Sequence, residues 1–252
     1  MKITVEAIHA MKAHGEKIAS LTAYDYPTAR LLDEAGIPMI LVGDSMGMVV
    51  FGYSNTTQVT MADMLHHLRM VARAKTSSLL GADLPFHSYD TVKSAVANAK
   101  KLAAAGAGFV KAEGGREILP QIRAIIAAGI PFCGHLGMLP QHVLEEGGYR
   151  VKGKNVAEQK RLLADARTLE KAGAFAIVLE LVVPALAAQI SKAISIPTIG
   201  IGSGPDCDGQ ILVTPDLVGS FPWFRPKFVQ PHADVAGNIK SAVTSWKNFV
   251  TK

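Results

Sequence analysis

One short pattern recurs four times along this chain: a glycine closes an apolar helix, a short hydrophobic strand follows, and the strand ends in a polar side chain. The copies are EAGIPMILVGD (34–44), AAGAGFVKAEG (104–114), AAGIPFCGHLG (127–137) and KAGAFAIVLEL (171–181). A fifth strand, LLGADLP (79–85), carries Asp83 in the same way. A glycine-capped helix next to a buried strand is typical of a repeated βα unit. If the parallel strands form one closed sheet, their polar ends must meet in space.

Eight apolar runs predict eight strands, the strand number of a (βα)8 barrel. Most runs are continuous rather than alternating, as expected for parallel strands covered on both faces. They lie at 18–24, 39–45, 79–85, 109–114, 131–137, 176–181, 197–203 and 210–214. Thr60 and Asp90 each precede an amphipathic stretch and are predicted to cap a helix. We expect an α/β fold, a (βα)8 TIM barrel, in a single domain over 1–252 with a helix at each end.

An open, doubly wound sheet is the alternative, because apolar spacing does not show whether a sheet closes. The sequence has no linker or shift in composition that would divide it. The glycine-rich segment EEGGYRVKGKN (145–155) is predicted to be a mobile loop over the mouth of the barrel.

Composition and charge argue against several other classes of protein. Of the 252 residues, 49% are hydrophobic and 19% charged, a balance that favours a compact cytoplasmic enzyme. The net charge is +5, but the basic residues are scattered, so we expect no nucleic-acid partner. No apolar run is long enough to span a bilayer, so we expect no membrane partner. The two cysteines, Cys133 and Cys207, lack metal-ligand spacing and indicate a reduced compartment.

Three acids on successive predicted strands, Asp44, Asp83 and Glu113, form a candidate metal site. A carboxylate at the end of a hydrophobic strand is costly unless it is paired, hydrated or bound to a metal. Hard oxygen donors without cysteine or a histidine pair suit Mg²⁺. The alternative is that the acids pair with capping amides and with Lys111, which faces the same way as Glu113.

Glu180 is a candidate general base, because it follows the apolar run AIVL and burial raises the pKa of a carboxyl. A salt bridge to a neighbouring strand is the alternative role. His135 is expected at the barrel mouth, either facing the substrate or making a hydrogen bond in the core. Ser45 lacks a nucleophile-elbow motif and is therefore a candidate hydrogen-bond donor rather than a nucleophile.

Several motifs together resemble the ketopantoate hydroxymethyltransferase (3-methyl-2-oxobutanoate hydroxymethyltransferase) family. They span almost the whole chain in one order: LTAYDYPTA (21–29), LVGDSMGMVVFGY (41–53), ADLPF (82–86), VKAEGG (110–115), PFCGHLGMLPQ (131–141), GGYRVKG (147–153), VLE (178–180), IPTIGIGSGPDCDGQILV (196–213) and PKF (226–228). The pairing of VGDS with ADLPF and VKAEGG is the most specific part, because these match the family's metal and substrate strands.

The resemblance implies a role for each matching residue. Asp44, Asp83 and Glu113 match the Mg²⁺ ligands. Asp44 with Ser45, Asp83 and Lys111 match the positions that hold the 2-oxo acid, and Glu180 matches the proton acceptor. His135 is included as a substrate-binding candidate.

The resemblance also implies a cytoplasmic (βα)8 barrel that assembles as a homodecamer. Its substrates would be 3-methyl-2-oxobutanoate and, as the one-carbon donor, 5,10-methylenetetrahydrofolate. Three stretches depart from the family pattern: Pro184 comes later than expected after Glu180, Lys152 stands where a Gln is expected, and 219–228 is unusually rich in aromatic residues and Pro.

Two other functions remain open. The first is a Mg²⁺-dependent 2-oxo acid lyase or mutase of the phosphoenolpyruvate mutase/isocitrate lyase type, which typically uses a nucleophilic Cys or a distinct lid motif. The second is a non-enzymatic barrel that binds a ligand or serves assembly. The loss of one metal acid or of the base would indicate the second, and the sequence retains all of them.

Overall fold

The eight predicted strands form one closed, parallel barrel in the order β1 to β8, which confirms the (βα)8 fold and rules out the open sheet. The structure is a computed structural model that describes residues 2–252. The strands are β1 (Ile18–Thr22), β2 (Met39–Val42), β3 (Leu79–Asp83), β4 (Phe109–Glu113), β5 (Phe132–Gly137), β6 (Ala176–Glu180), β7 (Thr198–Ile201) and β8 (Gly209–Leu212). The backbone N–H of Ile18 donates to Asp208 O at 3.0 Å, where the last strand meets the first.

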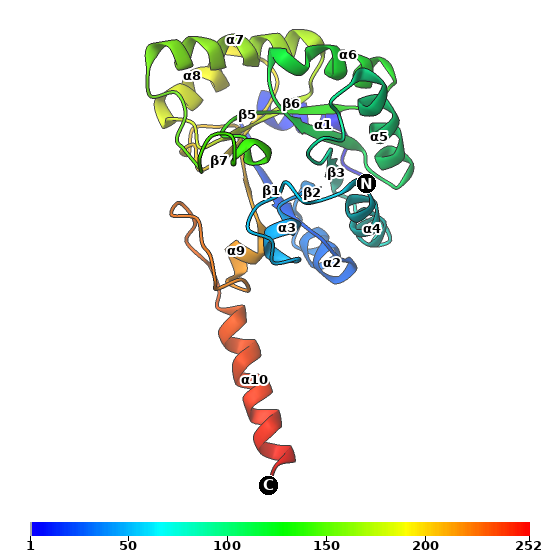
Figure 1. Ribbon diagram of the computed structural model, residues 1–252, viewed down its shortest axis with the longest axis vertical. Helices are drawn as coiled ribbons and strands as arrows, with labels where there is room; N and C mark the ends of the chain where they lie inside the picture. The colour runs from blue at the N-terminus through cyan, green and yellow to red at the C-terminus, as the bar shows by residue number, and fades with distance from the viewer. Residues whose placement is uncertain (1) are drawn as a thin grey trace. The chain divides into compact units, whose positions relative to one another are not determined.

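Within residues 2–211, helices alternate with the strands and lie outside them (Figure 1). The α-helices are α1 (Val5–Ala13), α2 (Tyr26–Glu34), α3 (Met46–Val49), α4 (Met61–Ala72), α5 (Val92–Ala104), α6 (Leu119–Ala127), α7 (Val156–Ala172), α8 (Pro184–Ala193), α9 (Thr214–Val218) and α10 (Val235–Val250). Two 3₁₀ turns, η1 (Arg116–Ile118) and η2 (Pro140–His142), follow β4 and β5.

Helix caps follow the expected chemistry, with one correction. Thr60 caps α4 as predicted, in a reciprocal pair of hydrogen bonds with Asp63. The predicted cap of α5, Asp90, is wrong. Thr91 caps α5 instead, because its hydroxyl accepts from the backbone N–H of Ser94, and Asp90 lies 3.0 Å from His87 Nδ1.

The lower part of the barrel lumen is filled with apolar side chains. Leu79, Phe109, Cys133 and Val178 are buried in one cluster and come from four neighbouring strands. Gly81 is required here, since a Cβ at this position would collide with the ring of Phe109. The Phe109 ring therefore fills the lumen, and the polar residues further along β4 lie above a packed floor.

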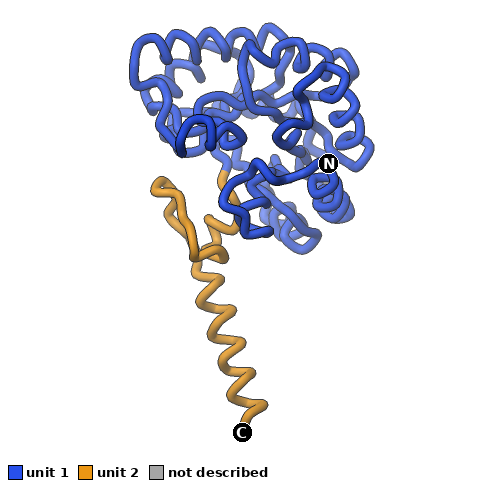
Figure 2. The backbone as a smooth tube through the Cα atoms, in the orientation of Figure 1, with its two compact units in different colours: residues 1–211 blue, residues 212–252 orange. Residues whose placement is uncertain are grey.

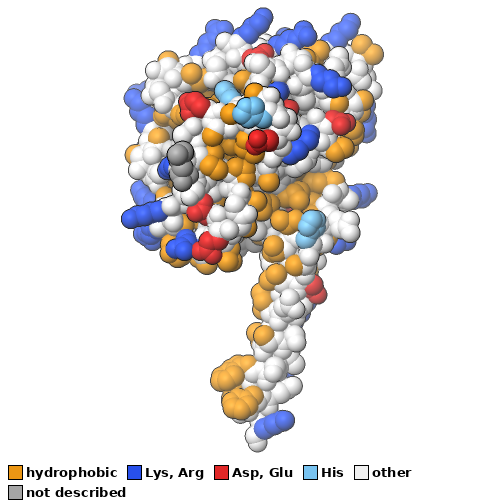
Figure 3. Space-filling view, turned by 180° about the vertical axis from the view of Figure 1, so that it is seen from behind, with side chains coloured by type: hydrophobic (Ala, Val, Ile, Leu, Met, Phe, Trp, Pro, Cys, Tyr) orange, Lys and Arg blue, Asp and Glu red, His pale blue; other side chains and the backbone are white. Residues whose placement is uncertain are grey.

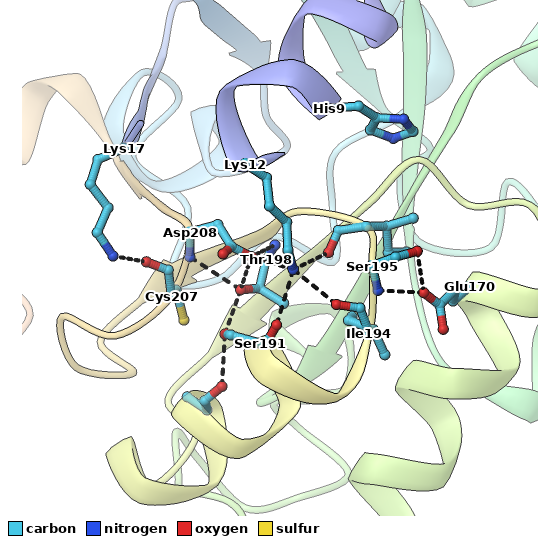
Figure 4. Close-up of polar contacts among 12 residues, drawn as sticks. His9, Lys12, Lys17, Glu170, Ser191, Ile194, Ser195, Thr198, Cys207 and Asp208 are labelled. Carbon is cyan, nitrogen blue, oxygen red and sulfur yellow. Dashed lines mark hydrogen bonds and ion pairs between the residues drawn. The ribbon is translucent and has the colours of Figure 1, made fainter. Parts of the chain in front are cut away.

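Helix α1 closes the N-terminal end of the barrel. Ile8 on α1 is fully buried in the same apolar cluster, and His9 Nε2 lies 2.8 Å from Phe175 O, just before β6. Lys12 Nζ donates to three carbonyls, one in the last turn of α8 and two in the segment before β7, and pairs with Asp208 at 2.9 Å (Figure 4). The polar side chains at the ends of the strands lie at the opposite end of the barrel.

The chain groups into two compact units, residues 1–211 and residues 212–252 (Figure 2). The first contains nearly all of the barrel. The second contains α9, an aromatic segment and α10. The single domain over 1–252 stays a prediction. Within residues 2–252, no helix combines the length and the apolar character needed to cross a bilayer.

Candidate active site

The C-terminal ends of β2 to β6 bring the predicted site residues together. Asp44 follows β2, Asp83 ends β3, Lys111 and Glu113 lie on β4, His135 lies on β5 and Glu180 ends β6. Five of these six side chains are buried, and the side chain of Glu180 is 13% exposed. As predicted, Lys111 and Glu113 face the same side of β4, because residues two apart in a strand point the same way.

Asp83 is the link between the acids and the only lysine of the cluster. Its Oδ1 lies 3.1 Å from Lys111 Nζ, and its Oδ2 accepts from the backbone N–H of Asp44 at 3.1 Å. The β3–β4 register places Asp83 beside Lys111. One carboxylate therefore fixes both the lysine and the turn that carries Asp44.

His135 joins the lysine to the candidate base. Lys111 Nζ lies 3.3 Å from His135 Nδ1, and His135 Nε2 lies 3.2 Å from Glu180 Oε2. Burial and the Lys111 cation hold the pKa of His135 well below its usual range, so the ring is neutral. An ammonium only donates, so Nδ1 is the acceptor and the proton lies on Nε2, facing Glu180.

Negative charge exceeds positive charge at this end of the barrel. Burial and the Asp83 carboxylate raise the pKa of Asp44 to about 7. Burial, followed by the Asp44 carboxylate, raises the pKa of Glu113 well above its usual range. Burial raises the pKa of Glu180 to about 7, with Lys111 opposing the shift. Burial alone would lower the pKa of Lys111, but Asp83, Glu113 and Asp44 together raise it.

The donor set fits a divalent cation. Asp83 Oδ1 is a buried polar atom that makes no well-aligned hydrogen bond to any described residue, although Lys111 Nζ lies 3.1 Å away. Between residues 2 and 252, no three His, Cys, Asp or Glu side chains are grouped closely enough to hold a metal as they stand. Mg²⁺ usually binds through one or two carboxylates and keeps waters for a substrate to displace, so it requires no such cage. The Mg²⁺ ligands stay a prediction.

Ser45 is held at the mouth by a residue that the sequence reasoning missed. Its Oγ lies 2.8 Å from Tyr24 Oη, and although Ser45 is the N-cap residue before α3, its side chain makes no capping hydrogen bond. His67 is buried, and its Nδ1 lies 2.7 Å from Tyr24 O. The motif LTAYDYPTA contained Tyr24, but a tyrosine after a strand carries no distinctive spacing.

Gln141 and Tyr89 were also missed. Gln141 lies in η2, is 2% exposed, and donates through Nε2 to Asp44 Oδ2 at 2.7 Å. Tyr89, in the loop after β3, donates to Gln141 Oε1 at 2.5 Å. Both come from loops that follow strands, and in sequence an uncharged residue in such a loop gives little sign of burial.

The turn after Glu180 is strained and tightly packed. Leu181 has a φ of +48°, which is unfavourable for a branched residue, and its N–H donates to Ile201 O at 2.9 Å. On the neighbouring strand Gly137 has a φ of +100°, and a Cβ there would collide with Glu180 O. The later position of Pro184 is accommodated by this turn, after which Pro184 starts α8. These contacts fix the backbone that carries Glu180.

The predicted loop 145–155 reaches the same end of the barrel. Lys152 N–H donates to Leu181 O at 2.8 Å, and Lys152 O accepts from Val183 N–H at 2.9 Å. The Lys152 side chain pairs with Glu146, so the loop is also tied to itself. Tyr149 Oη lies 3.5 Å from Met48 Sδ. The loop therefore contacts segments that follow β2 and β6; its mobility stays a prediction.

Two solved structures illustrate the similarity of the fold. A phosphonopyruvate hydrolase in complex with oxalate and Mg²⁺ matches with a TM-score of 0.65 at 17% identity, covering 84% of this chain and 81% of that chain. A 2,3-dimethylmalate lyase of the phosphoenolpyruvate mutase/isocitrate lyase superfamily matches with a TM-score of 0.65 at 15% identity, covering 100% and 89%. At these identities the likeness shows the fold alone.

Sequence comparison is more specific. A 3-methyl-2-oxobutanoate hydroxymethyltransferase of Moorella thermoacetica is 51% identical over 251 residues, which cover 99% of this chain and 93% of the relative. The protein of the same name from Syntrophus aciditrophicus is 51% identical over 97% of this chain and 91% of its own length. The family model for ketopantoate hydroxymethyltransferase matches residues 2–252. This chain therefore belongs to the ketopantoate hydroxymethyltransferase family.

Proposed function

We propose that this protein transfers a hydroxymethyl group from 5,10-methylenetetrahydrofolate to 3-methyl-2-oxobutanoate, giving 2-dehydropantoate (ketopantoate), the first step of pantothenate synthesis. Family membership supports the reaction. The observation that carries the mechanism is the placement of Glu180, whose pKa is raised to about 7 by burial, beside a cluster of three acids and one lysine. A base with a pKa near the working pH is suited to removing a proton from carbon next to a keto group.

Asp44, Asp83 and Glu113 would hold Mg²⁺. When bound, the cation supplies Lewis-acid stabilisation of the negative charge that develops on the keto oxygen of the substrate. Lys111 lies beside Asp83 and neutralises the substrate carboxylate, while Ser45, held by Tyr24, donates a hydrogen bond. Buried, fixed donors of this kind need no reorganisation as the charge develops.

Glu180 removes the proton from C3 of the 2-oxo acid, and the electron pair left on C3 is delocalised onto the keto oxygen. That carbon forms the new C–C bond with the methylene carbon of the folate, whose two C–N bonds are broken in the overall reaction. Water supplies the hydroxyl group, and tetrahydrofolate leaves with both nitrogens protonated. His135 lies beside the base, with its Nε2 3.2 Å from Glu180 Oε2.

Deuterium exchange at C3 tests the first step. In D₂O with Mg²⁺ and without folate, 3-methyl-2-oxobutanoate should lose its C3 proton to solvent. With methylenetetrahydrofolate added, 2-dehydropantoate should accumulate. If neither exchange nor product is seen with Mg²⁺ present, the proposed function is wrong and the non-enzymatic barrel becomes the better reading.

The lyase or mutase reading is the second candidate, because one structure of similar fold is a 2,3-dimethylmalate lyase of that superfamily. It is less well supported by the cysteines. Cys133 lies buried in the lumen, where burial raises the pKa of its thiol to about 12, and Cys207 is also buried. Neither is placed as an accessible nucleophile at the mouth. Cleavage of a 2-oxo acid without folate, and without C3 exchange of 3-methyl-2-oxobutanoate, would favour this candidate.

We also propose that the protein works in the cytoplasm as a homodecamer, as the family resemblance implies. Helix α10 supports self-association, because large apolar side chains at spacings of three and four residues are exposed along it: Ile239, Val243, Trp246, Phe249 and Val250. Figure 3 shows hydrophobic side chains gathered along this helix. Sedimentation equilibrium should give a mass ten times that of one chain; a monomer would contradict the proposal.

A further inference from the structure

Gln141 is a buried side chain that no role in the reaction has yet used. It lies in η2, between β5 and the loop that contains Tyr149, and only 2% of it is exposed. A buried primary amide has two N–H donors and a carbonyl acceptor to satisfy. Its partners therefore define what it does.

All the polar groups of this side chain are engaged. Nε2 donates to Asp44 Oδ2 at 2.7 Å and to Leu84 O at 3.0 Å, and Oε1 accepts from Tyr89 Oη at 2.5 Å. A backbone carbonyl only accepts, so the amide nitrogen must face Leu84 and Asp44. The hydroxyl of Tyr89 donates to the amide oxygen, which fixes the same orientation from the other side.

The backbone of Gln141 contacts a second acid. Its N–H donates to Glu113 Oε2 at 2.9 Å, and Tyr89 Oη also lies 3.2 Å from Glu113 O. One residue thus holds one oxygen of Asp44 and one oxygen of Glu113, from strands β2 and β4. These hydrogen bonds engage Oδ2 and Oε2, which turns the other oxygen of each carboxylate away from Gln141.

We propose that Gln141 is a positioning residue for the divalent cation, and that Tyr89 acts through it by fixing its amide. Gln141 orients Asp44 with its side chain and Glu113 with its backbone, so that the two carboxylates offer one oxygen each. The inference rests on the metal assignment of the proposed function. It goes further because neither residue touches the cation, and each acts on the ligands instead.

Direct cation binding tests the inference without turnover. Mn²⁺ binding to the metal-free protein is measured by electron paramagnetic resonance in the wild type, Gln141→Met and Tyr89→Phe. Partners that orient metal ligands typically contribute about 10- to 100-fold to affinity, so Gln141→Met should bind Mn²⁺ that much more weakly. Tyr89→Phe keeps the amide and loses one hydrogen bond, so a weakening of about two- to tenfold is expected.

Two matched variants control for the substitutions themselves. Gln121→Met changes a partly exposed glutamine on α6, and Tyr26→Phe changes an exposed tyrosine on α2. Both should keep wild-type Mn²⁺ affinity. Thermal unfolding checks that each variant is folded, and if Gln141→Met does not fold, Tyr89→Phe alone decides the outcome.

A double-mutant cycle separates positioning from simple packing. If Tyr89 acts through Gln141, adding Tyr89→Phe to Gln141→Met should weaken Mn²⁺ binding little further. In activity assays the apparent KM for Mg²⁺ should rise in Gln141→Met, while kcat at saturating Mg²⁺ should recover to within severalfold of wild type. Wild-type Mn²⁺ affinity in the folded single variants would overturn this inference alone. A wild-type protein that binds no Mn²⁺ would overturn the metal assignment together with it.

Discussion

Both ends of the barrel have charged side chains next to the strand ends. The charges are balanced by a partner at the N-terminal end, whereas acids outnumber cations at the C-terminal end. At the N-terminal end, Lys12 Nζ pairs with Asp208 and donates to the carbonyls of Ser191, Ile194 and Ile196, all at 2.9–3.0 Å. Asp208 Oδ2 in turn accepts from the N–H and hydroxyl of Thr198 (Figure 4). One cation meets one anion there, and Asp208 Oδ2 accepts two further hydrogen bonds.

At the C-terminal end four acids share one lysine and a neutral histidine. The pKa of Asp44 and that of Glu180 are both raised to about 7, chiefly by burial. Such an arrangement costs folding free energy, since buried like charges repel and desolvation is incompletely offset. The comparison indicates that the N-terminal end contributes stability, whereas the mouth sacrifices stability for binding and proton transfer.

Removing the base should give the largest effect. It should abolish proton transfer at the C-terminal end of the barrel while the contacts at the N-terminal end, and the fold, remain unchanged. Glu180→Gln keeps the shape of the side chain but cannot accept a proton, so C3 exchange should fall by roughly 10²–10⁴-fold. Binding of Mn²⁺ and of the 2-oxo acid should remain, as should the fold. Exchange is followed by NMR without folate, so a damaged folate site could not imitate the result. Normal exchange in the variant would move the base elsewhere, with His135 the next candidate.

Removing a metal acid should give the next largest effect. Asp44→Asn and Asp83→Asn each delete a charge at the mouth, and each should weaken Mg²⁺ affinity by at least about tenfold, because even partners behind the ligands contribute that much. Asp44→Asn should lower the free energy of unfolding little, since it relieves repulsion among the acids, whereas Asp83→Asn should lower it, since buried Lys111 loses its paired carboxylate. Mg²⁺ titrations of activity, with urea unfolding in parallel, measure both. Full activity of both variants at limiting Mg²⁺ would refute the three-acid assignment.

The sequence predicted the fold and the acids well because both depend on local pattern. Each strand was located to within a few residues, and the strand ends identified Asp44, Asp83, Glu113 and Glu180 as neighbours in space. The two-residue alternation of side chains along β4 was enough to place Lys111 on the same side as Glu113. Hydrophobic period and glycine caps are short-range signals, which a single sequence carries in full.

The hydrogen-bonding partners of the site could not be predicted in the same way. Tyr24, Tyr89 and Gln141 reach the site from loops, and loop paths depend on packing between distant segments. The cap of α5 failed for a related reason, because Asp90 and Thr91 are both good caps and only the local backbone decides between them.

Disrupting the N-terminal end should produce the reverse pattern, with a smaller effect. Lys12→Met keeps the length of the side chain but leaves Asp208 and three carbonyls without the ammonium. The free energy of unfolding should fall by about 1–3 kcal/mol, the usual cost of leaving partly buried polar groups unsatisfied. C3 exchange per folded molecule should stay at the wild-type rate. A loss of exchange with unchanged stability would contradict the division of roles between the ends.

The smallest expected effect is a pH dependence of stability that originates at the mouth. Glu180 has a pKa of about 7 in the fold, against an ordinary value of 4.5, with Lys111, His135, Asp44 and Glu113 as its charged or titratable neighbours. Between pH 4.5 and about pH 7, Glu180 holds a proton in the folded protein that it has released in the unfolded chain. Stability from this group is therefore present below about pH 4.5 and is lost as pH rises through 7.

Glu180→Gln isolates this contribution, because glutamine does not titrate. Urea unfolding of the metal-free wild type and the variant at pH 5 and pH 8 gives the difference in stability at each pH. The variant should gain on the wild type between pH 5 and pH 8 by on the order of 1 kcal/mol, which allows for redistribution of protons among the other acids. Adding Mg²⁺ at pH 8 should restore stability to the wild type, because a cation that binds only the folded mouth offsets the same repulsion. If the difference between the two proteins does not change with pH, Glu180 ionises in the fold as it does in the unfolded chain. The mouth would then be electrostatically balanced like the N-terminal end, and the contrast between the two ends would rest on geometry alone.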